Sequence, residues 1–369
     1  EKNISLDSDG DKVFESLFKS LFKHHTYGTQ TTIGTIEHLK NPSLQKIRDF
    51  YSTWYVPNNM IISIAGNFDP EETLALIEES FGKFPAKPIP TQTVKPEKPV
   101  NKPEEISVYG PESPSVTIGF RLPAANSKEA SLMRVTDMLL SNSSAGIFDL
   151  NLVKKQKVLS ASAGVYNLHD YSVLFLEGKP KTGQTLEEVK QLLLDQLDSL
   201  KNGTIDQKTL KAIILNKEVD EMSANENNSS RAFKMLNSFI QHRNWIDVVA
   251  ESEYMQKVSV SDIQNFAKIW LNTDYSLVYK KEGIDSAVVK IDKPEITPVE
   301  VNRNKLSHFT KDILDNEAKP LKPQFLDFEK DFTRTSIKPG IQLLSVKNKE
   351  NSLFSLYYVF EFGRFSNLK

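Results

Sequence analysis

Six histidines are the residues of this sequence best suited to ligate a metal ion. Two histidines bind zinc together when they lie about one helical turn apart, as in the H-x-x-E-H and H-E-x-x-H motifs, where the glutamate acts as general base. None of the histidines stands in either motif; they are His24, His25, His38, His169, His242 and His308. His24 and His25 are adjacent and would point apart on a helix, which favours a structural or surface role. His38 beside Glu37 is interpreted as a solvated pair in a turn.

The composition excludes several other chemistries. The sequence has no cysteine, which rules out disulfides, thiolate catalysis and zinc fingers. Its 46 lysines and arginines and 48 acidic residues give a net charge of −2, so there is no electrostatic reason to expect a nucleic acid or an anionic membrane as partner. No stretch approaches the roughly 18 apolar residues of a membrane-spanning helix. A content of 39% hydrophobic and 25% charged residues is typical of a globular protein, whose compartment the sequence does not indicate.

Proline-rich stretches divide the chain, which at 369 residues exceeds the usual size of one domain. Prolines at high density supply neither helix nor sheet donors, so residues 85–105 are predicted to form an extended linker. A second linker is expected over 292–331, with a short helix around 308–316. Residues 106–291 then form a complete domain, with shorter pieces at 1–84 and 332–369. Since the first residues, EKNISLDSDG, are neither a signal peptide nor a natural start, we expect a fragment of a longer protein.

The first of these pieces contains a predicted helix–turn–strand–helix unit, SLQKIRDFYSTWYVPNNMIISIAGNFDPEE. Ser43 is a plausible N-cap, MIISIAG is predicted to be a buried strand, and Asp69-Pro70 opens a helix that ends at Gly82. The pattern recurs 216 residues later, with Ser43, Ile47, Phe50 and Trp54 matched by Ser259, Ile263, Phe266 and Trp270. Two unrelated amphipathic helices would give the same spacing, but a strand at the same offset favours duplication of a domain of roughly 200 residues. Both tryptophans are then expected in equivalent, largely buried positions.

The middle domain reads as an α+β fold. Strands are predicted at SVTIGFRLP, LSASAGVYN and YSVLFLEG, with a helix opened by Ser127 after the first of them. A strong helix follows, with a capping box from Thr185 to Glu188 and a stop at Gly203. This order predicts an antiparallel or mixed sheet with helices gathered on one face.

Several of these segments together resemble one family. HHTYGTQTTIGTIEHLKN, followed by WYVPNNMIISIAGNFDPEE, is similar to the series that closes the first domain of the pitrilysin/insulinase family of zinc metallopeptidases. The tail TSIKPGIQLLSVKNKENSLFSLYYVFEFGR resembles the hairpin that opens a later domain of that family. The resemblance implies the pitrilysin/mitochondrial-processing-peptidase-like metallohydrolase fold. Residues 1–84 would be the end of the first domain, 106–291 the second domain, 292–331 the linker between halves, and 332–369 the truncated start of the third domain.

The resemblance also implies a zinc endopeptidase that encloses peptides between two halves. The family's H-x-x-E-H motif would lie before Glu1, so this chain alone is expected to be inactive and to bind no zinc tightly, although the intact protein would bind zinc. The family's third ligand is a glutamate upstream of a D-G pair, and Glu1 stands nine residues before Gly10. Glu1 is therefore the candidate metal ligand; the alternative is a solvated terminal carboxylate.

Two stretches of small residues match a substrate-binding edge in insulin-degrading relatives. They comprise Ser143, Ser144, Ala145 and Gly146, and Ser162, Ala163 and Gly164. Small side chains let a peptide backbone approach a sheet edge and pair with it as an added strand. The alternative is an ordinary turn and a strand packed under a helix. The implied partners are a peptide or protein substrate and the remaining halves of the same polypeptide. A non-catalytic relative, acting as scaffold, subunit or peptide-binding protein, is the second function class.

Overall fold

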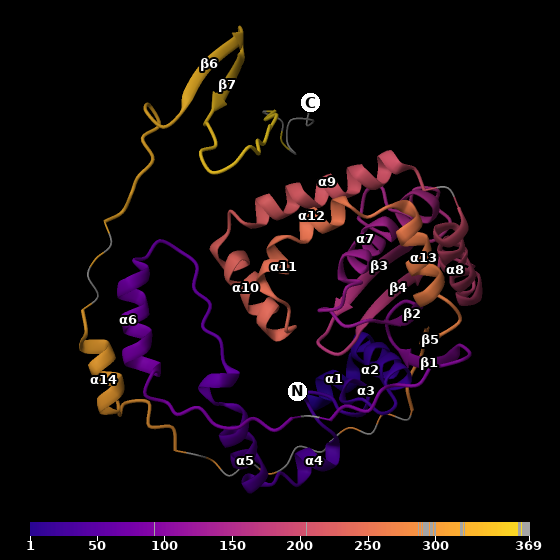
Figure 1. Cartoon of the computed structure of the whole chain (residues 1–369), viewed down its shortest axis with the longest axis horizontal. Helices are drawn as coiled ribbons and strands as arrows, with labels where there is room; N and C mark the ends of the chain where they lie inside the picture. Colours follow the sequence, from indigo (N-terminus) through magenta and orange to yellow (C-terminus); the bar gives the residue numbers. More distant parts are fainter. Residues whose placement is uncertain are drawn as a thin grey trace. The chain divides into compact units, whose positions relative to one another are not determined.

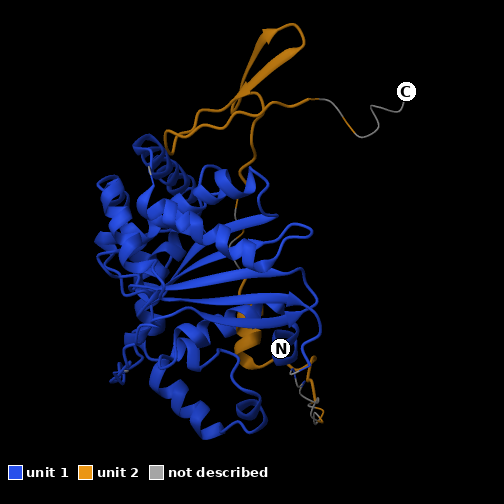
Figure 2. Cartoon of the chain, turned by 90° about the vertical axis from the view of Figure 1, so that its right-hand side faces the viewer, with its two compact units in different colours: residues 1–291 blue, residues 292–369 orange. Residues whose placement is uncertain are grey.

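A computed structural model describes residues 1–91, 93–203, 205–286, 300–317 and 322–360, with positions 288, 290, 295, 298, 320 and 363. The chain divides into two compact units, Glu1–Ile291 and Asp292–Lys369, which Figure 2 draws in blue and orange. Residues 361–362 and 364–369, at the end of the predicted third-domain segment, lie outside the described residues.

Unit 1 contains nearly all of the regular structure (Figure 1). Its first helices are α1 (Lys2–Asp7), α2 (Asp9–Leu21), α3 (Thr26–Thr29), α4 (Ile36–Lys40), α5 (Leu44–Trp54) and α6 (Pro70–Phe81). The later helices are α7 (Ala130–Leu140), α8 (Leu186–Asn202), α9 (Gln207–Ala224), α10 (Asn228–Ile240), α11 (Trp245–Val249), α12 (Glu251–Gln256) and α13 (Val260–Trp270). Two short turns of other helix types are η1 (Pro57–Asn59) and η2 (Asp149–Val153). The strands are β1 (Glu104–Gly110), β2 (Ser115–Leu122), β3 (Ser160–Asn167), β4 (Ser172–Lys179) and β5 (Tyr275–Glu282).

The five strands form one sheet in the order β1-β5-β2-β4-β3. β1 runs parallel to β5, and the other neighbours are antiparallel. The predicted α+β fold with a mixed sheet is confirmed. β1 was not predicted, because EEISVYG follows the proline-rich linker directly and its side chains alternate only weakly in polarity.

One face of the sheet is covered by α7, α8 and α13 (Figure 2). Val189 and Leu193 of α8 are fully buried against this face, and the predicted capping box of α8 is present with both of its hydrogen bonds. The predicted role of Ser127 is wrong. The helix after β2 begins at Ala130, and Ser127 instead closes a turn in which its carbonyl accepts from the N–H of Ala130.

The other face of the sheet is covered by α2, from the N-terminal piece of the chain. Leu17, Phe18, Leu21 and Phe22 of this helix pack on valines of three strands, Val108, Val173 and Val278. A Cβ at Gly119 of β2 would lie 2.9 Å from Cδ2 of Leu17, so the helix can approach this closely only over a glycine. The prediction of helices on one face thus holds for the middle domain, whereas the N-terminal segment supplies the second layer.

A buried ion pair joins α2 to the sheet. The Asp9 carboxylate lies 2.7 Å from Nζ of Lys280 on β5, and the two side chains are only 2% and 3% exposed. Lys280 also donates to the carbonyl of Glu112, whose N–H in turn donates to Asp9 at 2.9 Å. Burial alone would raise the pKa of Asp9, but the hydrogen bonds from Lys280 and Glu112 hold it below its ordinary value. A Cβ at Gly110 would overlap the Asp9 carboxylate, so a glycine is needed at the end of β1.

Two helices lie at the matched positions of the predicted repeat. α5 and α13 begin and end at equivalent positions, and Ser43 and Ser259 each cap their helix by accepting an N–H three residues ahead. Ile263 and Phe266 of α13 are 0% and 3% exposed. Their counterparts on α5, Ile47 and Phe50, are 57% and 59% exposed.

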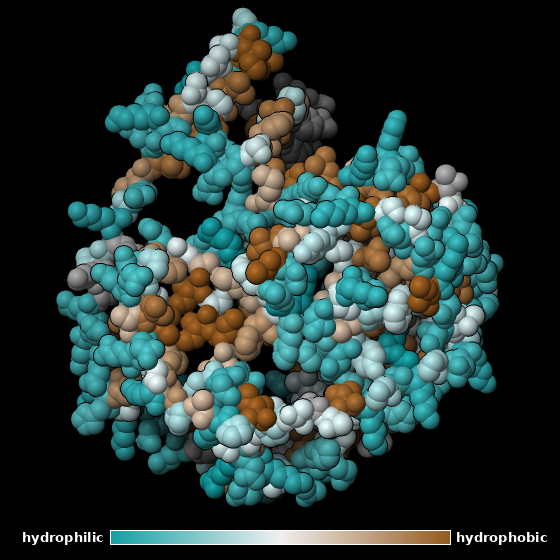
Figure 3. All heavy atoms as spheres, viewed as in Figure 1, coloured by the Kyte–Doolittle hydropathy of each residue, from teal (hydrophilic) through white to brown (hydrophobic). Residues whose placement is uncertain are grey.

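The prediction of a buried strand at MIISIAG is wrong. Residues 60–65 form no strand in the described part of the chain, and most of their apolar side chains are exposed. β5, at the equivalent place in the second copy, is paired on both sides by β1 and β2, and no described strand does this for 60–65. Figure 3 shows apolar surface gathered around α6 and this segment. Trp54 and Trp270 are both only partly buried, less than expected.

Unit 2 holds α14 (His308–Asp315) and an antiparallel hairpin of β6 (Thr333–Lys338) and β7 (Ile341–Ser345). The helix is where the sequence places it, and Gly340 makes the turn of the hairpin with φ +81°. This hairpin differs from the one that the resemblance implies for the tail, because the apolar residues 353–360, which the structure describes, form no strand. In the described parts of both units, no helix has the length and apolar character needed to cross a membrane.

Candidate functional site

The outer edge of β3 is the candidate functional site. β3 is the terminal strand of its sheet, and within the described residues it pairs only with β4. Ser162 is exposed, whereas Ala163 and Gly164 are partly buried on the strand. A Cβ at Gly164 would meet no atom within 4 Å, so the sheet face over this glycine is open. The predicted small-residue stretch 160–164 lies on the terminal strand of the sheet, where small side chains would let another backbone approach.

One contact indicates which backbone groups of β3 face outward. The carbonyl of Lys179, the register partner of Ser160, points towards β3 and accepts the N–H of Leu159 at 2.9 Å. Because backbone groups alternate in direction along a strand, the N–H and C=O groups of Ala161 and Ala163 point outward with those of Val165.

Asp137 is the ionisable group at this edge. Its carboxylate is partly buried where α7 packs against β3. Burial raises the pKa of Asp137 to about 6, against the opposing effects of the Val165 N–H and of the positive charges of Arg134 and Lys217. Above about pH 6, Asp137 therefore carries a negative charge.

The other predicted stretch, 143–146, is a loop organised by Asp149. This carboxylate is almost fully buried and accepts the N–H groups of Asn142 and Gly146 at 2.9 and 3.0 Å. The side-chain oxygen of Asn142 accepts the N–H groups of Ser144 and Ala145, forming an Asx turn. Ser143 has φ +64°, a left-handed conformation that this turn requires. The loop follows α7 directly and β3 packs against α7, so both stretches adjoin the same helix.

We expect replacement of Asp149 by Ala to lower the free energy of unfolding by about 1–3 kcal/mol, because two buried N–H groups lose their acceptor. Urea denaturation measures this loss, and faster amide exchange at Asn142 and Gly146 locates it. Lys155→Ala, an exposed change after the same short helix, is the control and should alter stability little. Unchanged exchange at both amides in Asp149→Ala would contradict the assigned role.

Glu1 occupies the N-cap position of α1 and is exposed, and its side chain makes no capping hydrogen bond. Over the described residues, no group of three histidine, aspartate or glutamate side chains is placed to hold a metal ion. The described side chains therefore do not fit a complete zinc site. Glu1 alone can supply at most one ligand.

The sequence profile described as "Peptidase M16 inactive domain" matches residues 42–216, from the N-cap of α5 through the linker and sheet to α9. Over these residues the chain is related to the pitrilysin/insulinase (M16) family of peptidases. The resemblance seen in the sequence is confirmed by this match and by relatives named as zinc proteases.

Three M16 relatives illustrate the extent of the match. The chain is 24% identical over 278 residues to the zinc protease PqqE of Helicobacter pylori, covering 73% of this chain and 62% of that protein. It is 24% identical over 286 residues to the uncharacterized zinc protease YmxG of Bacillus subtilis, covering 73% and 65%. The crystal structure of a protease from Helicobacter pylori matches with a TM-score of 0.68 at 23% identity, over 74% of this chain and 68% of that one. The chain thus spans less than two thirds of the first two relatives.

His25 has the structural role expected for it. Its ring is buried, with Nε2 3.1 Å from the Asp170 carboxylate and Nδ1 accepting the N–H of Tyr27. The Tyr27 hydroxyl accepts the N–H of Asp170. Two contacts thus hold the segment HHTYG against the β3–β4 connection. The cluster of His25, Tyr27 and Asp170 joins two parts of the fold. Its described contacts show no free position where a metal ion could bind.

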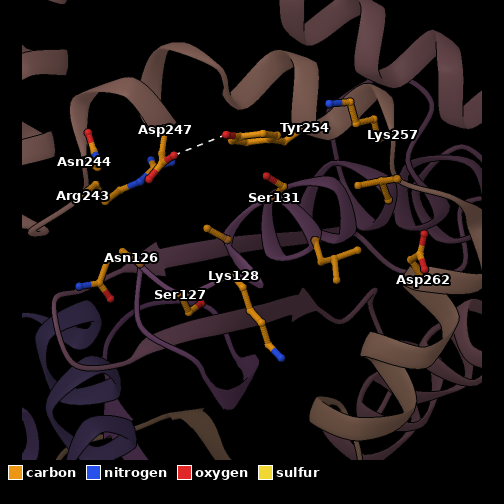
Figure 4. A pocket seen from close by; sticks show the side chains of 14 residues that line it. Asn126, Ser127, Lys128, Ser131, Arg243, Asn244, Asp247, Tyr254, Lys257 and Asp262 are labelled. Atoms are coloured by element: carbon orange, nitrogen blue, oxygen red, sulfur yellow. Dashed lines mark hydrogen bonds between the residues drawn. The ribbon is translucent and has the colours of Figure 1, made fainter.

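A separate hollow of about 560 Å³ lies between the start of α7 and helices α11 to α13 (Figure 4). Its charged groups are largely engaged elsewhere, since Arg243 pairs with Glu251 at 2.9 Å and Asp262 belongs to the capping box of α13. Within the hollow, the Tyr254 hydroxyl lies 3.5 Å from Asp247. None of the predicted site residues lines it, and the edge of β3 remains the better candidate site.

Asp149 is a site residue that the sequence did not reveal. Its carboxylate accepts backbone N–H groups that a loop brings to it. The one available signal was an aspartate just after the small-residue stretch SNSSAG, where a carboxylate can accept the exposed N–H groups of a tight loop.

Proposed function

We propose that this chain is part of a zinc-dependent endopeptidase of the M16 family whose second domain, residues 106–291, holds the peptide substrate. The observation that carries the proposal is the position of β3 as the terminal strand of its sheet, with outward backbone groups at Ala161 and Ala163. A peptide would add to this edge as a sixth strand. Main-chain hydrogen bonds would supply affinity with little dependence on the peptide sequence.

The loop 143–146 would form one boundary of the bound peptide. Its N–H groups are already used by Asp149 and Asn142, which leaves it rigid and without a large side chain. A rigid boundary of Ser143, Ser144, Ala145 and Gly146 suits close approach of another backbone, since none of these residues needs to move aside. The predicted substrate-binding residues thus act by shape and backbone, not by side-chain chemistry.

Glu1 is proposed to complete a zinc site in the intact protein. A carboxylate beside two neutral imidazoles lowers the charge of the site and leaves a fourth position for water, as catalytic zinc requires. The imidazoles and the general base would come from an H-x-x-E-H motif outside this sequence. This chain by itself would therefore neither cleave peptides nor retain zinc.

A non-catalytic relative is the second candidate function. The matching profile is described as an inactive domain, and no H-x-x-E-H occurs in this sequence. Such a protein would keep the peptide-binding edge and lack the hydrolytic step. Peptidase activity of the intact protein, abolished by a zinc chelator and restored by zinc, separates the two candidates.

Replacing Ala163 by Pro tests the binding edge. Proline removes one outward N–H and leaves the bonds of Ser162 and Gly164 to β4 in place. We expect an unstructured peptide of about ten residues, long enough for one strand, to bind roughly tenfold more weakly. Fluorescence anisotropy of the peptide, labelled at its C-terminus, measures the change.

Two controls accompany this variant. Ser162→Ala alters an exposed side chain on the same strand without touching outward backbone groups, and should bind as the wild type does. A peptide N-methylated at alternate residues cannot pair with a strand edge, and should bind weakly to the unchanged protein. Equal affinity of wild type and a folded Ala163→Pro variant would exclude strand addition at this edge.

A further inference from the structure

Two histidines that are far apart in the sequence lie against each other in the fold. His169 belongs to the β3–β4 connection, and His242 belongs to the connection between α10 and α11. Their ring centres are 4.1 Å apart, and the ring planes are inclined at 67°. The side chain of His169 is 39% exposed and His242 is exposed, so a dissolved ion can reach both rings.

A fixed carboxylate orients the ring of His169. Oδ1 of Asp170 lies 2.9 Å from Nδ1 of His169, and Oδ2 of the same carboxylate lies 3.1 Å from Nε2 of the buried His25. In the neutral ring of His169, this contact places the proton on Nδ1 and leaves the lone pair of Nε2 free. Histidines that bind metal ions commonly have such a carboxylate partner on the nitrogen that does not bind the ion.

The backbone holds His242 in place at the end of α10. Its N–H donates to the carbonyl of Phe239 at 3.0 Å, and its φ is +51°. Within the described residues, the ring of His242 and Nε2 of His169 take part in no hydrogen bond or ion pair. The neighbouring Arg243 pairs with Glu251 at 2.9 Å, which compensates its positive charge. Two imidazoles with free nitrogen lone pairs therefore lie together beside one carboxylate.

We propose that His169 and His242 together bind one divalent transition-metal ion of the kind that prefers imidazole ligands, such as Cu²⁺ or Zn²⁺. Two imidazoles at adjacent positions of one ion have ring centres roughly 4.5–5 Å apart, since metal–nitrogen bonds are about 2.0–2.1 Å long. Rotation of two exposed side chains can supply the small change from the observed 4.1 Å. No third histidine, aspartate or glutamate among the described residues is placed to join them, so water completes the coordination.

Cu²⁺ is the first probe, because it binds nitrogen ligands most tightly among the divalent first-row metals. Electron paramagnetic resonance of this chain should show one Cu²⁺ with two nitrogen ligands. In His169→Gln, and in His242→Asn, whose new residue tolerates the left-handed backbone, one nitrogen should be lost. Cu²⁺ should then bind at least about tenfold more weakly. His38→Gln, which removes an exposed histidine elsewhere, is the control and should leave the spectrum and the affinity unchanged.

Amide hydrogen exchange of the unmutated chain with Zn²⁺ gives a second measurement, which does not depend on a variant folding. A bound ion ties the β3–β4 connection to the α10–α11 connection, so the amides of residues 169–171 and 242–244 should exchange more slowly. Unchanged exchange at both connections would overturn the proposal. A two-nitrogen Cu²⁺ spectrum that is absent from the wild type, or that persists in both histidine variants, would overturn it as well.

Discussion

Replacing Lys280 by Met should lower the free energy of unfolding of unit 1 by about 3–5 kcal/mol, because it leaves the Asp9 carboxylate buried without its partner. Asp9 and Lys280 are 2.7 Å apart with nearly no solvent contact, and they join α2 to β5. A methionine of similar length fills the space but supplies neither the charge nor the donor. Urea denaturation of wild type and variant, with equal slopes, measures the difference.

The control is Lys290→Met, which breaks an exposed pair to Asp7 from the same N-terminal segment. Exposed pairs contribute about 0–1 kcal/mol, so this change should be small. The double variant Asp9→Leu/Lys280→Met should recover much of the loss, since no buried charge is left. A loss no larger than that of Lys290→Met would show that the buried pair does not hold α2 to the sheet.

The loss of stability caused by Lys280→Met should become smaller at low pH. The pKa of Asp9 lies below its ordinary value in the folded chain, so its contribution is present at neutral pH and is lost as the pH falls below about 4. In Lys280→Met the same carboxylate is buried without compensation and takes up a proton more readily. The stability difference between wild type and variant should therefore shrink in acid.

Replacing Glu1 by Gln should reduce zinc affinity and turnover by about 100-fold or more, in a longer polypeptide that carries H-x-x-E-H before Glu1. The amide keeps the shape of the ligand but lacks its negative charge. Stability should barely change, because Glu1 is exposed and makes no capping hydrogen bond. Zinc content after dialysis against a mild chelator measures the effect independently of activity.

The choice of control for Glu1 follows from the structure. Asp9 lies close to Glu1 in the sequence but is the buried partner of Lys280, so its replacement would disturb the whole helix and is unsuitable as a control. Asp11→Asn, an exposed change in the first turn of α2, is suitable and should leave zinc content near normal. Full zinc and full activity in Glu1→Gln would place the third ligand elsewhere.

Local sequence signals were sufficient to predict many of the helices and the strands near the middle of the sheet. The capping box of α8, the serine caps of α5 and α13 and the apolar runs of β2 and β4 depend on residues close in sequence. The segment MIISIAG shows where such signals fail. Its sequence suits a strand, yet a strand requires neighbours, and the described residues provide none.

The candidate site was only partly predictable for the same reason. The small residues of 160–164 suggested an edge, but the strand order that makes β3 an edge depends on pairings between distant segments. The ion pair of Asp9 with Lys280 also joins residues far apart in sequence. No periodicity or local motif encodes such partners, so the second helical layer could be seen only in the structure.

Amide hydrogen exchange of β3 tests the central claim, that a peptide adds to this edge as a strand. With a saturating unstructured peptide, the outward amides of Ala161 and Ala163 should exchange more slowly, whereas that of Ser162, already bound to β4, should change little. Exchange in the β6–β7 hairpin of unit 2 should be unaffected. Protection that appears elsewhere on the chain, with Ala161 and Ala163 exchanging as fast as in the free protein, would contradict the account.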